Sequence, residues 1–235
     1  MNKLAIVTRC DDNLKAMSDI TMPIIEQYAK KCNADLHILS HIPTVNTWDN
    51  KPHYRILECI GLLDKYDRIL ALDCDMIINK DCPNIFNIVP EDMIGSIYED
   101  KGSRKSDRME RIKDIQNAFG NVGWVENYTN AGTFIFSKQH KNILMPVEEE
   151  YWSERGSVDV HLSYNIHKYN FKVFELSYKW NHMTMFSESW NGNANRFNSH
   201  IIHYAGGGIF DSNVSTKLEQ IKKDYETIYV RDKKI

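Results

Sequence analysis

The stretch of sequence that decides the fold is YDRILALDCDMII, residues 66–78. Ile69 to Leu72 are consecutive apolar residues, and such a run without alternation predicts a short strand buried on both faces, as in a parallel sheet. Ligands of open α/β sheets bind beyond the carboxyl ends of the strands, and residues two apart on an extended segment point to the same side. Asp73 and Asp75 therefore predict a pair of carboxylates that can hold a divalent cation. The alternative is a solvated turn, where Asp is common.

The length of 235 residues fits one large α/β domain or two small ones, and it is long enough to bury a core. The sequence contains no repeat, low-complexity segment or evident linker, so we expect one domain. The net charge of −3 and the pI of about 6.3 give no overall basic footprint, which argues against a nucleic-acid partner.

The cysteine pattern and the N-terminus bear on the compartment. The five cysteines are odd in number and no pair has CxxC spacing, which argues against a disulfide framework or a zinc site and favours a reducing compartment. The first residues become polar too soon for a signal peptide, and no run of 18 apolar residues occurs. We therefore expect a cytoplasmic protein without a transmembrane segment, in which the sequons at Asn127 and Asn213 are chance matches.

The pattern along the rest of the chain predicts alternating strands and helices. Further strands are expected at 4–7, 35–39, 93–98, 133–136, 171–176 and from Ile201. Helices are expected at 23–32, 53–64, 106–119, 138–151 with a kink near Pro146, from Ser157 and at 215–230.

The loop after the first strand, Thr8 to Asn13, lies where nucleotides often bind in doubly wound sheets. It contains neither a GxGxxG fingerprint nor a P-loop. Asp11, Asp12 and Asn13 can cap the next helix or contact a ligand, and the two interpretations are compatible.

Other polar residues have two interpretations each. Arg55 can pair with a phosphate or an acidic metal site, or it is simply a solvent-exposed helix residue. Asp159 opens a helix, where the helix dipole stabilises a carboxylate, so it is either a structural residue of the first turn or a residue of the site. The charged stretch 99–107 is either a lid or acceptor loop or a solvated surface. The segment 180–200 is rich in Trp, Asn and His, which suits sugar rings but also any irregular loop.

Small residues mark two more positions. Ala131 and Gly132, before a strand, let another group approach the backbone closely. His203 follows a short strand and precedes Gly206 to Gly208, whose backbone N–H groups can face an anion. Taken alone, His203 is more simply interpreted as a packed strand residue. Its position beside three glycines, in a chain that also contains an Asp-x-Asp, predicts that it contacts a metal or a phosphate.

These pieces stand in an order that resembles the GT-A fold nucleotide-sugar glycosyltransferases. The closest resemblance is to family 8, which includes glycogenin and the bacterial lipooligosaccharide galactosyltransferases, over roughly residues 4–208. The N-terminal Thr-Arg-Cys-Asp-Asp pattern also resembles the family 34-type enzymes. The pieces are Thr8-Arg9-x-Asp11-Asp12-Asn13, Tyr66-Asp67-Arg68-x5-Asp73-x-Asp75, Asn130-Ala131-Gly132 and His203-x2-Gly206.

The resemblance implies a Rossmann-like α/β fold, with a mixed, mainly parallel sheet flanked by helices in a single domain over residues 1–235. It implies a nucleotide-binding half at about 1–100, an acceptor half at about 101–210 and a C-terminal helix at 211–235. The implied activity is metal-dependent transfer of a sugar from a UDP-sugar to a glycan or glycoconjugate hydroxyl, with retention. If the enzyme inverts instead, Asp159 is the candidate base.

The resemblance also assigns site residues. The ligands of Mn²⁺ (or Mg²⁺) are expected to be Asp73, Asp75 and His203, and the imidazole favours Mn²⁺. The expected contacts to uracil and ribose are Thr8, Arg9, Asp12 and Asn13. The other expected donor contacts are Arg55, Cys74, Ala131, Gly132, Gly206 and Gly207. The candidate catalytic residues, beside the donor sugar and the acceptor, are Asn130 and Asp159.

The sequence departs from family 8 after the histidine. That family usually continues with Gly-x-x-Lys-Pro-Trp, whose lysine touches the diphosphate, whereas this chain has Gly207-Gly208-Ile209-Phe210. Two other classes remain as alternatives. A haloacid-dehalogenase-like phosphatase also uses Asp-x-Asp, but after its first strand rather than its third. A glycan-binding domain without catalysis would use the 180–200 segment.

Overall fold

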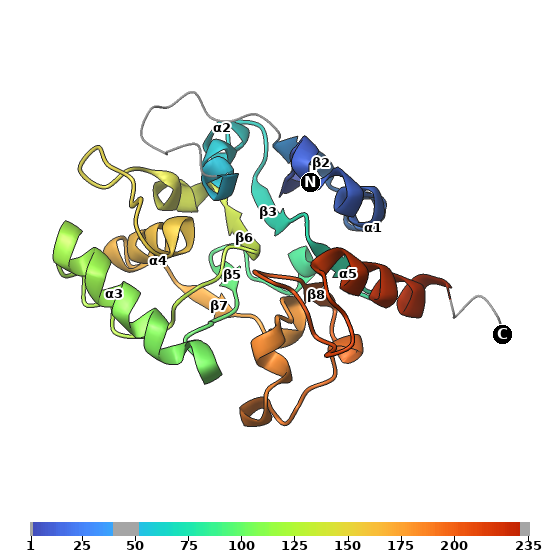
Figure 1. Cartoon of the computed structure of the whole chain (residues 1–235). Coiled ribbons are helices and arrows are strands. Elements are labelled where there is room, and N and C mark those ends of the chain that lie inside the picture. The colour runs from blue at the N-terminus through green and yellow to red at the C-terminus, as the bar shows by residue number, and fades with distance from the viewer. Residues whose placement is uncertain (1, 40–51, 231–235) are drawn as a thin grey trace.

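The computed structural model describes residues 2–39 and 52–230. Its central sheet has six strands in the order β2-β1-β3-β6-β5-β7 (Figure 1). The sheet is mixed, because β6 runs antiparallel to both β3 and β5 while the other three pairs are parallel. This arrangement confirms the expected α/β class. The strands are β1 Leu4–Arg9, β2 Asp35–Leu39, β3 Arg68–Asp73, β5 Ile94–Ser96, β6 Thr133–Ser137 and β7 Val173–Glu175.

Helices cover both faces of this sheet (Figure 1). The α-helices are α1 Lys15–Cys32, α2 Cys59–Leu62, α3 Lys105–Phe119, α4 Ser157–Lys168 and α5 Lys217–Tyr225. Short 3-10 segments are Asp12–Leu14, Pro52–Glu58, Ile85–Asn87, Gly102–Arg104, Lys138–Leu144, Tyr178–Trp180, Thr184–Ser187, Ser189–Asn191 and Arg196–Asn198, and a π-helical turn, Glu226–Val230, follows α5. In the described part of the chain, no helix combines the length and the apolar character needed to cross a bilayer.

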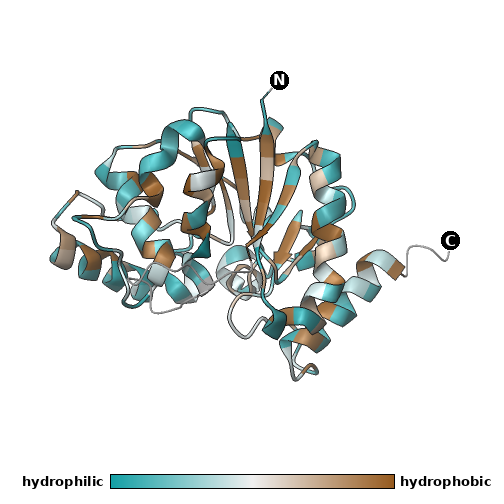
Figure 2. Cartoon of the chain, turned by 90° about the horizontal axis from the view of Figure 1, so that it is seen from above, coloured by the Kyte–Doolittle hydropathy of each residue, from teal (hydrophilic) through white to brown (hydrophobic). Residues whose placement is uncertain are grey.

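The alternation of side chains along the strands builds two cores. Ile6 and Leu70 face α1, α5 and a two-stranded ribbon, whereas Val7 and Ala71 face α2 and α4, and all four are buried. Seen from above, the apolar strands lie between two groups of helices (Figure 2). Burial on both faces explains why residues 69–72 form an unbroken apolar run.

The register of β1 and β3 brings their carboxyl ends together. The two strands are parallel, and their last residues, Arg9 and Asp73, are paired. Strand β6 is antiparallel to β3 and begins at Thr133, so the preceding residues 130–132 reach the same edge. This edge therefore gathers three polar segments that are far apart in the sequence.

The two-stranded ribbon adds a fourth segment. Strand β4, Met76–Ile78, follows Asp75 directly and pairs antiparallel with β8, Ile201–His203. Met76 lies opposite His203 in this register, so the histidine lies next to Asp75 although 128 positions separate them in sequence.

Helix α1 begins eight residues earlier than the sequence predicted, at Lys15, and Pro23 lies inside it. An internal proline removes one helical hydrogen bond and usually ends or kinks a helix. Here Thr21 and Met17, about one and two turns before Ile24, are buried together with it. The packing of this continuous face outweighs the cost of the proline.

The helix predicted at 138–151 is wrong beyond Leu144. The structure has a 3-10 segment at Lys138–Leu144, after which Met145 is extended. Met145 precedes Pro146, and a residue before proline is disfavoured in the helical region. The helix predicted at 53–64 is likewise mostly 3-10, with only the short α2 at its end.

Candidate functional site

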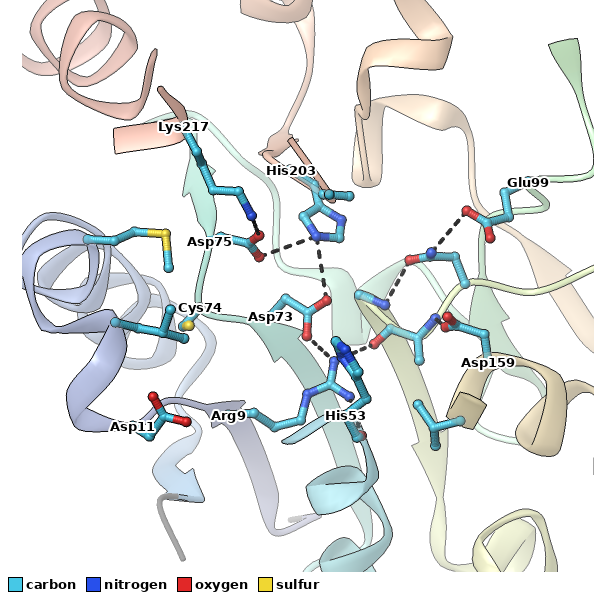
Figure 3. Close-up of a pocket in the computed structure, with 18 of the residues that line it drawn as sticks. Arg9, Asp11, His53, Asp73, Cys74, Asp75, Glu99, Asp159, His203 and Lys217 are labelled. Atoms are coloured by element: carbon cyan, nitrogen blue, oxygen red, sulfur yellow. Dashed lines mark hydrogen bonds and ion pairs between the residues drawn. The ribbon is translucent and has the colours of Figure 1, made fainter. Parts of the chain in front are cut away.

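A cavity of about 700 Å³ opens at the edge of the sheet where β1 and β3 end (Figure 3). Its volume lies in the range usual for small-molecule sites, roughly 300–1,000 Å³. The lining is rich in charge of both signs. The acids are Asp11, Asp73, Asp75, Glu99 and Asp159, and the bases are Arg9, Arg104, Arg108 and Lys217, with His53 and His203 beside them.

Asp73, Asp75 and His203 converge on one point of this cavity. One ligand atom from each lies within 4.8 Å of the other two. Nε2 of His203 is 3.5 Å from Oδ2 of Asp73 and 3.3 Å from Oδ1 of Asp75 (Figure 3). Two carboxylates and an imidazole form a donor set that suits Mn²⁺ or a similar divalent cation. The side chains therefore fit the metal site that the sequence predicted.

Two bases hold the outer oxygens of the same carboxylates. The guanidinium of Arg9 pairs with Oδ1 of Asp73, and Nζ of Lys217 lies 2.9 Å from Oδ2 of Asp75. These pairs leave Oδ2 of Asp73 and Oδ1 of Asp75 facing His203. Burial opposes charge on both Asp75 and His203, but their attraction outweighs burial, so the pKa of His203 is raised and that of Asp75 is held well below its usual range.

A chain of hydrogen bonds between buried side chains ends at Nδ1 of His203, the ring nitrogen that does not face the two carboxylates. Nδ2 of Asn130 donates to Glu99, 3.1 Å away. Oδ1 of Asn130 accepts from the N–H of Gly132 at 2.8 Å and from Nδ2 of Asn181 at 2.7 Å. Oδ1 of Asn181 is then left facing Nδ1 of His203, also at 2.7 Å. A carboxylate only accepts, so the donor direction is fixed along the whole chain.

This direction determines the tautomer of His203. Because Oδ1 of Asn181 is an acceptor, Nδ1 of the ring must carry a proton and donate it. In the neutral ring the lone pair is then on Nε2, the atom that faces the two carboxylates. Fixing the tautomer of a histidine ligand through its second nitrogen is the usual role of such outer partners in metal sites.

Gly132 makes room for this ring. A Cβ at this position would lie 2.5 Å from Cε1 of His203 and 2.8 Å from Oδ1 of Asn130. Real Cβ atoms do not approach other atoms so closely, so a side chain here would displace the histidine. The expectation that a group comes close to the backbone is confirmed at Gly132, and the group is His203.

Comparisons with known proteins agree with this geometry. A family model described as glycosyl transferase family 8 matches residues 7–208. This chain belongs to glycosyl transferase family 8. The match covers all four pieces on which the resemblance was based, and it decides for a glycosyltransferase over a phosphatase or a glycan-binding domain. A search of curated protein sequences found no match.

Solved structures share the fold. WbbM, a bifunctional glycosyltransferase, has a TM-score of 0.65 at 12% identity, over 99% of this chain and 51% of its own. A glycosyltransferase involved in glycosylating the major capsid of PBCV-1 has 0.60 at 13%, over 94% and 98%. The galactosyltransferase LgtC, solved with donor and acceptor sugar analogues, has 0.59 at 13%, over 96% of each chain. This family 8 chain thus spans about half of WbbM and nearly all of the other two.

The structure brings most of the predicted site residues to the cavity. Those that line it are Arg9, Asn13, Asp73, Cys74, Asp75, Asn130, Ala131, Gly132, Asp159, His203 and Gly206. Four others are not in the lining: Thr8, Asp12, Arg55 and Gly207. Thr8 is fully buried within β1. The guanidinium of Arg55 is buried behind Asp11, 3.3 Å from its carboxylate, so Arg55 supports the first loop from outside the cavity.

Asp11 resolves the two interpretations of the first loop. Its side chain accepts a hydrogen bond from the N–H of Asn13 at 3.2 Å, which caps the 3-10 turn before α1. It also lines the cavity. Capping and a position at the ligand site therefore coexist in this residue.

The sequence did not single out three groups of this family 8 site. Lys217 lies in the first turn of α5 and is one lysine among several there. Asn181 lies in the segment 180–200, whose composition suits sugar rings but also any irregular loop. Glu99 is buried and paired with Arg104 at 3.0 Å and Arg108 at 2.6 Å. An acid followed five and nine positions later by arginines is the available signal for Glu99, but the sequence alone leaves the stretch 99–107 open between a lid or acceptor loop and a solvated surface.

Asp159 lies in the first turn of α4 and accepts a hydrogen bond from the N–H of Ala131 at 2.7 Å. Burial and the negative charge of nearby Glu99 raise its pKa from 3.8 to about 6, although the hydrogen bond and Arg9 favour the ionised form. The native carboxyl thus binds its proton more tightly than the unfolded one. Its ionisation costs stability as the pH rises from about 4 to about 6, by roughly 3 kcal/mol.

We therefore expect Asp159→Asn to stabilise the protein at pH 8, with an increase of ~1–3 kcal/mol in the free energy of unfolding. The amide oxygen still accepts from Ala131, but the buried charge is gone. Near pH 4 the gain should vanish, since Asp159 is then neutral as well. Calorimetric melting at both pH values measures the difference. Asp19→Asn, at an exposed helix position, is the matched control. A gain of equal size at both pH values would show that the charge is not its cause.

Proposed function

We propose that this chain transfers a sugar from a UDP-sugar to a hydroxyl group of a glycan or glycoconjugate, in a metal-dependent reaction with retention of configuration. The observation that carries the proposal is the convergence of Asp73, Asp75 and His203, whose ligand atoms lie within 4.8 Å of one another in the lining of the cavity. Family 8 membership supports a nucleotide-sugar donor.

The difficult step is departure of a nucleoside diphosphate from the anomeric carbon. A divalent cation on Asp73, Asp75 and His203 would offset the charge that develops on the diphosphate oxygens. Arg9 fixes Asp73 for this role and donates to the backbone oxygen of His53 at 3.0 Å, which ties β1 to the segment Pro52–Glu58. Gly206, at the rim, offers a backbone N–H group to an anion.

In the proposed reaction the bond between the anomeric carbon and the diphosphate oxygen breaks, and UDP leaves with the electron pair. The acceptor hydroxyl oxygen forms the new bond on the same face, and its proton passes to the released diphosphate. Asp159 accepts a hydrogen bond from the N–H of Ala131, which belongs to the segment proposed to lie beside the donor sugar. If the enzyme inverts, Asp159 is instead the base for the acceptor hydroxyl. The anomeric configuration of the first product, measured by NMR, distinguishes the two.

A thermal-shift experiment tests donor and metal together. We expect UDP with Mn²⁺ to raise the melting temperature by about 5–10 °C when the free ligand is at a hundredfold excess over its Kd, since binding to the native state then adds ~2.7 kcal/mol. UDP with a chelator should give a small shift. ADP and GDP with Mn²⁺ are the nucleotide controls. Equal stabilisation by UDP with and without metal would contradict the metal dependence, and stronger stabilisation by ADP or GDP would contradict the donor class.

A further inference from the structure

Lys217 contacts the candidate metal site from a separate part of the fold. It is the first residue of α5, which Thr216 caps in a capping box with Glu219. Its Nζ lies 2.9 Å from Oδ2 of Asp75, and its side chain is 30% exposed and lines the cavity (Figure 3). The ammonium therefore sits between a metal ligand and the open space of the site.

The other basic side chains that line the cavity are held more firmly in ion pairs. Arg9 is buried and paired with Asp73, while Arg104 and Arg108 both pair with the buried carboxylate of Glu99. Lys217 is the only lysine among the described residues that line the cavity. A lysine carries its charge on a flexible stem of four carbons, so its ammonium can exchange one anion for another. The segment 204–210 after His203 contains no lysine or arginine that could do so.

Lys217 and a divalent cation cannot share Asp75 without cost. Oδ1 of Asp75 faces the point of convergence and Oδ2 holds the ammonium, so the two positive charges would lie on opposite oxygens of one carboxylate. Like charges a few ångströms apart repel each other, and at a partly buried site water screens this repulsion only in part. Loading the site therefore weakens the hold of Asp75 on Lys217.

We propose that Lys217 is an exchangeable counter-ion: it neutralises Asp75 while the metal site is unloaded, and it moves onto the donor diphosphate once the site is loaded. The proposal rests on the proposed function for its second half. The positively charged side chain that contacts the leaving diphosphate is then Lys217, at the start of α5. The proposal also makes Lys217 a competitor of the metal and a partner of the nucleotide. Removing its charge should therefore strengthen metal binding and weaken nucleotide binding.

The test is Lys217→Met, which keeps the length and apolar character of the stem but removes the charge. Without nucleotide, the affinity for Mn²⁺ alone should rise about three- to tenfold, because the competing ammonium is gone. With saturating Mn²⁺, the affinity for UDP should fall about tenfold, because one charged hydrogen bond to the diphosphate is lost. Electron paramagnetic resonance measures free Mn²⁺, and isothermal titration calorimetry measures UDP binding.

Lys222→Met is the matched control, because Lys222 is exposed on the same helix and does not line the cavity. Lys217→Arg should retain both wild-type affinities to within a few-fold. A Lys217→Met protein with unchanged or weaker Mn²⁺ binding overturns the competition, and unchanged UDP binding overturns the transfer to the diphosphate. If the wild-type protein binds no UDP with Mn²⁺ present, the proposed function fails, while the measurement with Mn²⁺ alone still decides the pairing with Asp75.

Discussion

Replacing Asp75 with asparagine is expected to lower metal-dependent turnover by about 10³-fold, since the cation supplies several kcal/mol of charge stabilisation in the transition state. An amide carries no negative charge, so the site would keep only Asp73 and His203 as strong ligands. The same change deprives Lys217 of its carboxylate at 2.9 Å. We therefore expect Mn²⁺ binding to be lost together with turnover.

The fold should survive this substitution. The backbone oxygen of Asp75, not its side chain, accepts the hydrogen bond from Tyr204 that helps join β4 to β8. Circular dichroism and the melting temperature check this expectation, and release of UDP measures turnover. Asp67→Asn is the matched control: Asp67 precedes β3 and bonds the N–H of Lys3, at the opposite end of the strand from Asp75. An Asp75→Asn enzyme as active as the Asp67→Asn control would refute the metal assignment.

The position of Asp73 and Asp75 could be predicted because one local sequence pattern is sufficient for the prediction. An unbroken apolar run means a strand buried on both faces, and the end of such a strand in an α/β sheet is where ligands bind. The prediction that Asp73 and Asp75 lie together needed no knowledge of any other strand. His203 was harder, because its place depends on the antiparallel register of β4 with β8. It could be chosen only from the glycines beside it and from the family resemblance.

What the sequence could not provide is the direction in which polar side chains face. For Arg9 the resemblance implies a nucleotide contact, but it does not reveal that the guanidinium pairs with Asp73, the residue opposite it in the register of β1 and β3. For Arg55 it implies a contact to the donor, but it does not reveal the ion pair with Asp11. Lys217 lies on an amphipathic helix whose pattern does not distinguish one exposed lysine from another. Side-chain pairing across the fold depends on packing, and no local spacing encodes it.

Asn181 illustrates the same difficulty within a segment that did attract attention. Its neighbourhood in the sequence is rich in aromatic and amide side chains, which suit sugar rings but also any irregular loop. In the structure Asn181 is fully buried, is absent from the cavity lining and bonds to Asn130 and His203. It reaches the site only through the histidine ring, so it is a positioning residue.

Asn181→Leu is therefore expected to weaken Mn²⁺ binding by about 10- to 100-fold, the usual cost of losing the outer partner of a histidine ligand. Leucine is close in size but cannot accept the proton of Nδ1. The ring then loses the bond that orients Nε2 toward Asp73 and Asp75, and Nδ1–H is left buried without a partner, at a cost of ~1–3 kcal/mol. Asn130 keeps its bond from the N–H of Gly132, so the damage stays at the histidine.

The signature that separates positioning from a general loss of structure is rescue by metal. If Asn181 acts through His203, the turnover of Asn181→Leu should return toward the wild-type value as Mn²⁺ is raised, with the KM for the donor little changed at saturation. Asn191→Leu is the control for loss of an amide side chain, since it removes the bond from Asn191 to the backbone of Phe186, and Asn191 does not line the cavity. Wild-type Mn²⁺ affinity in Asn181→Leu would mean that His203 keeps its orientation without Asn181. A loss of turnover that excess Mn²⁺ does not restore would mean that the substitution damages the structure beyond the histidine.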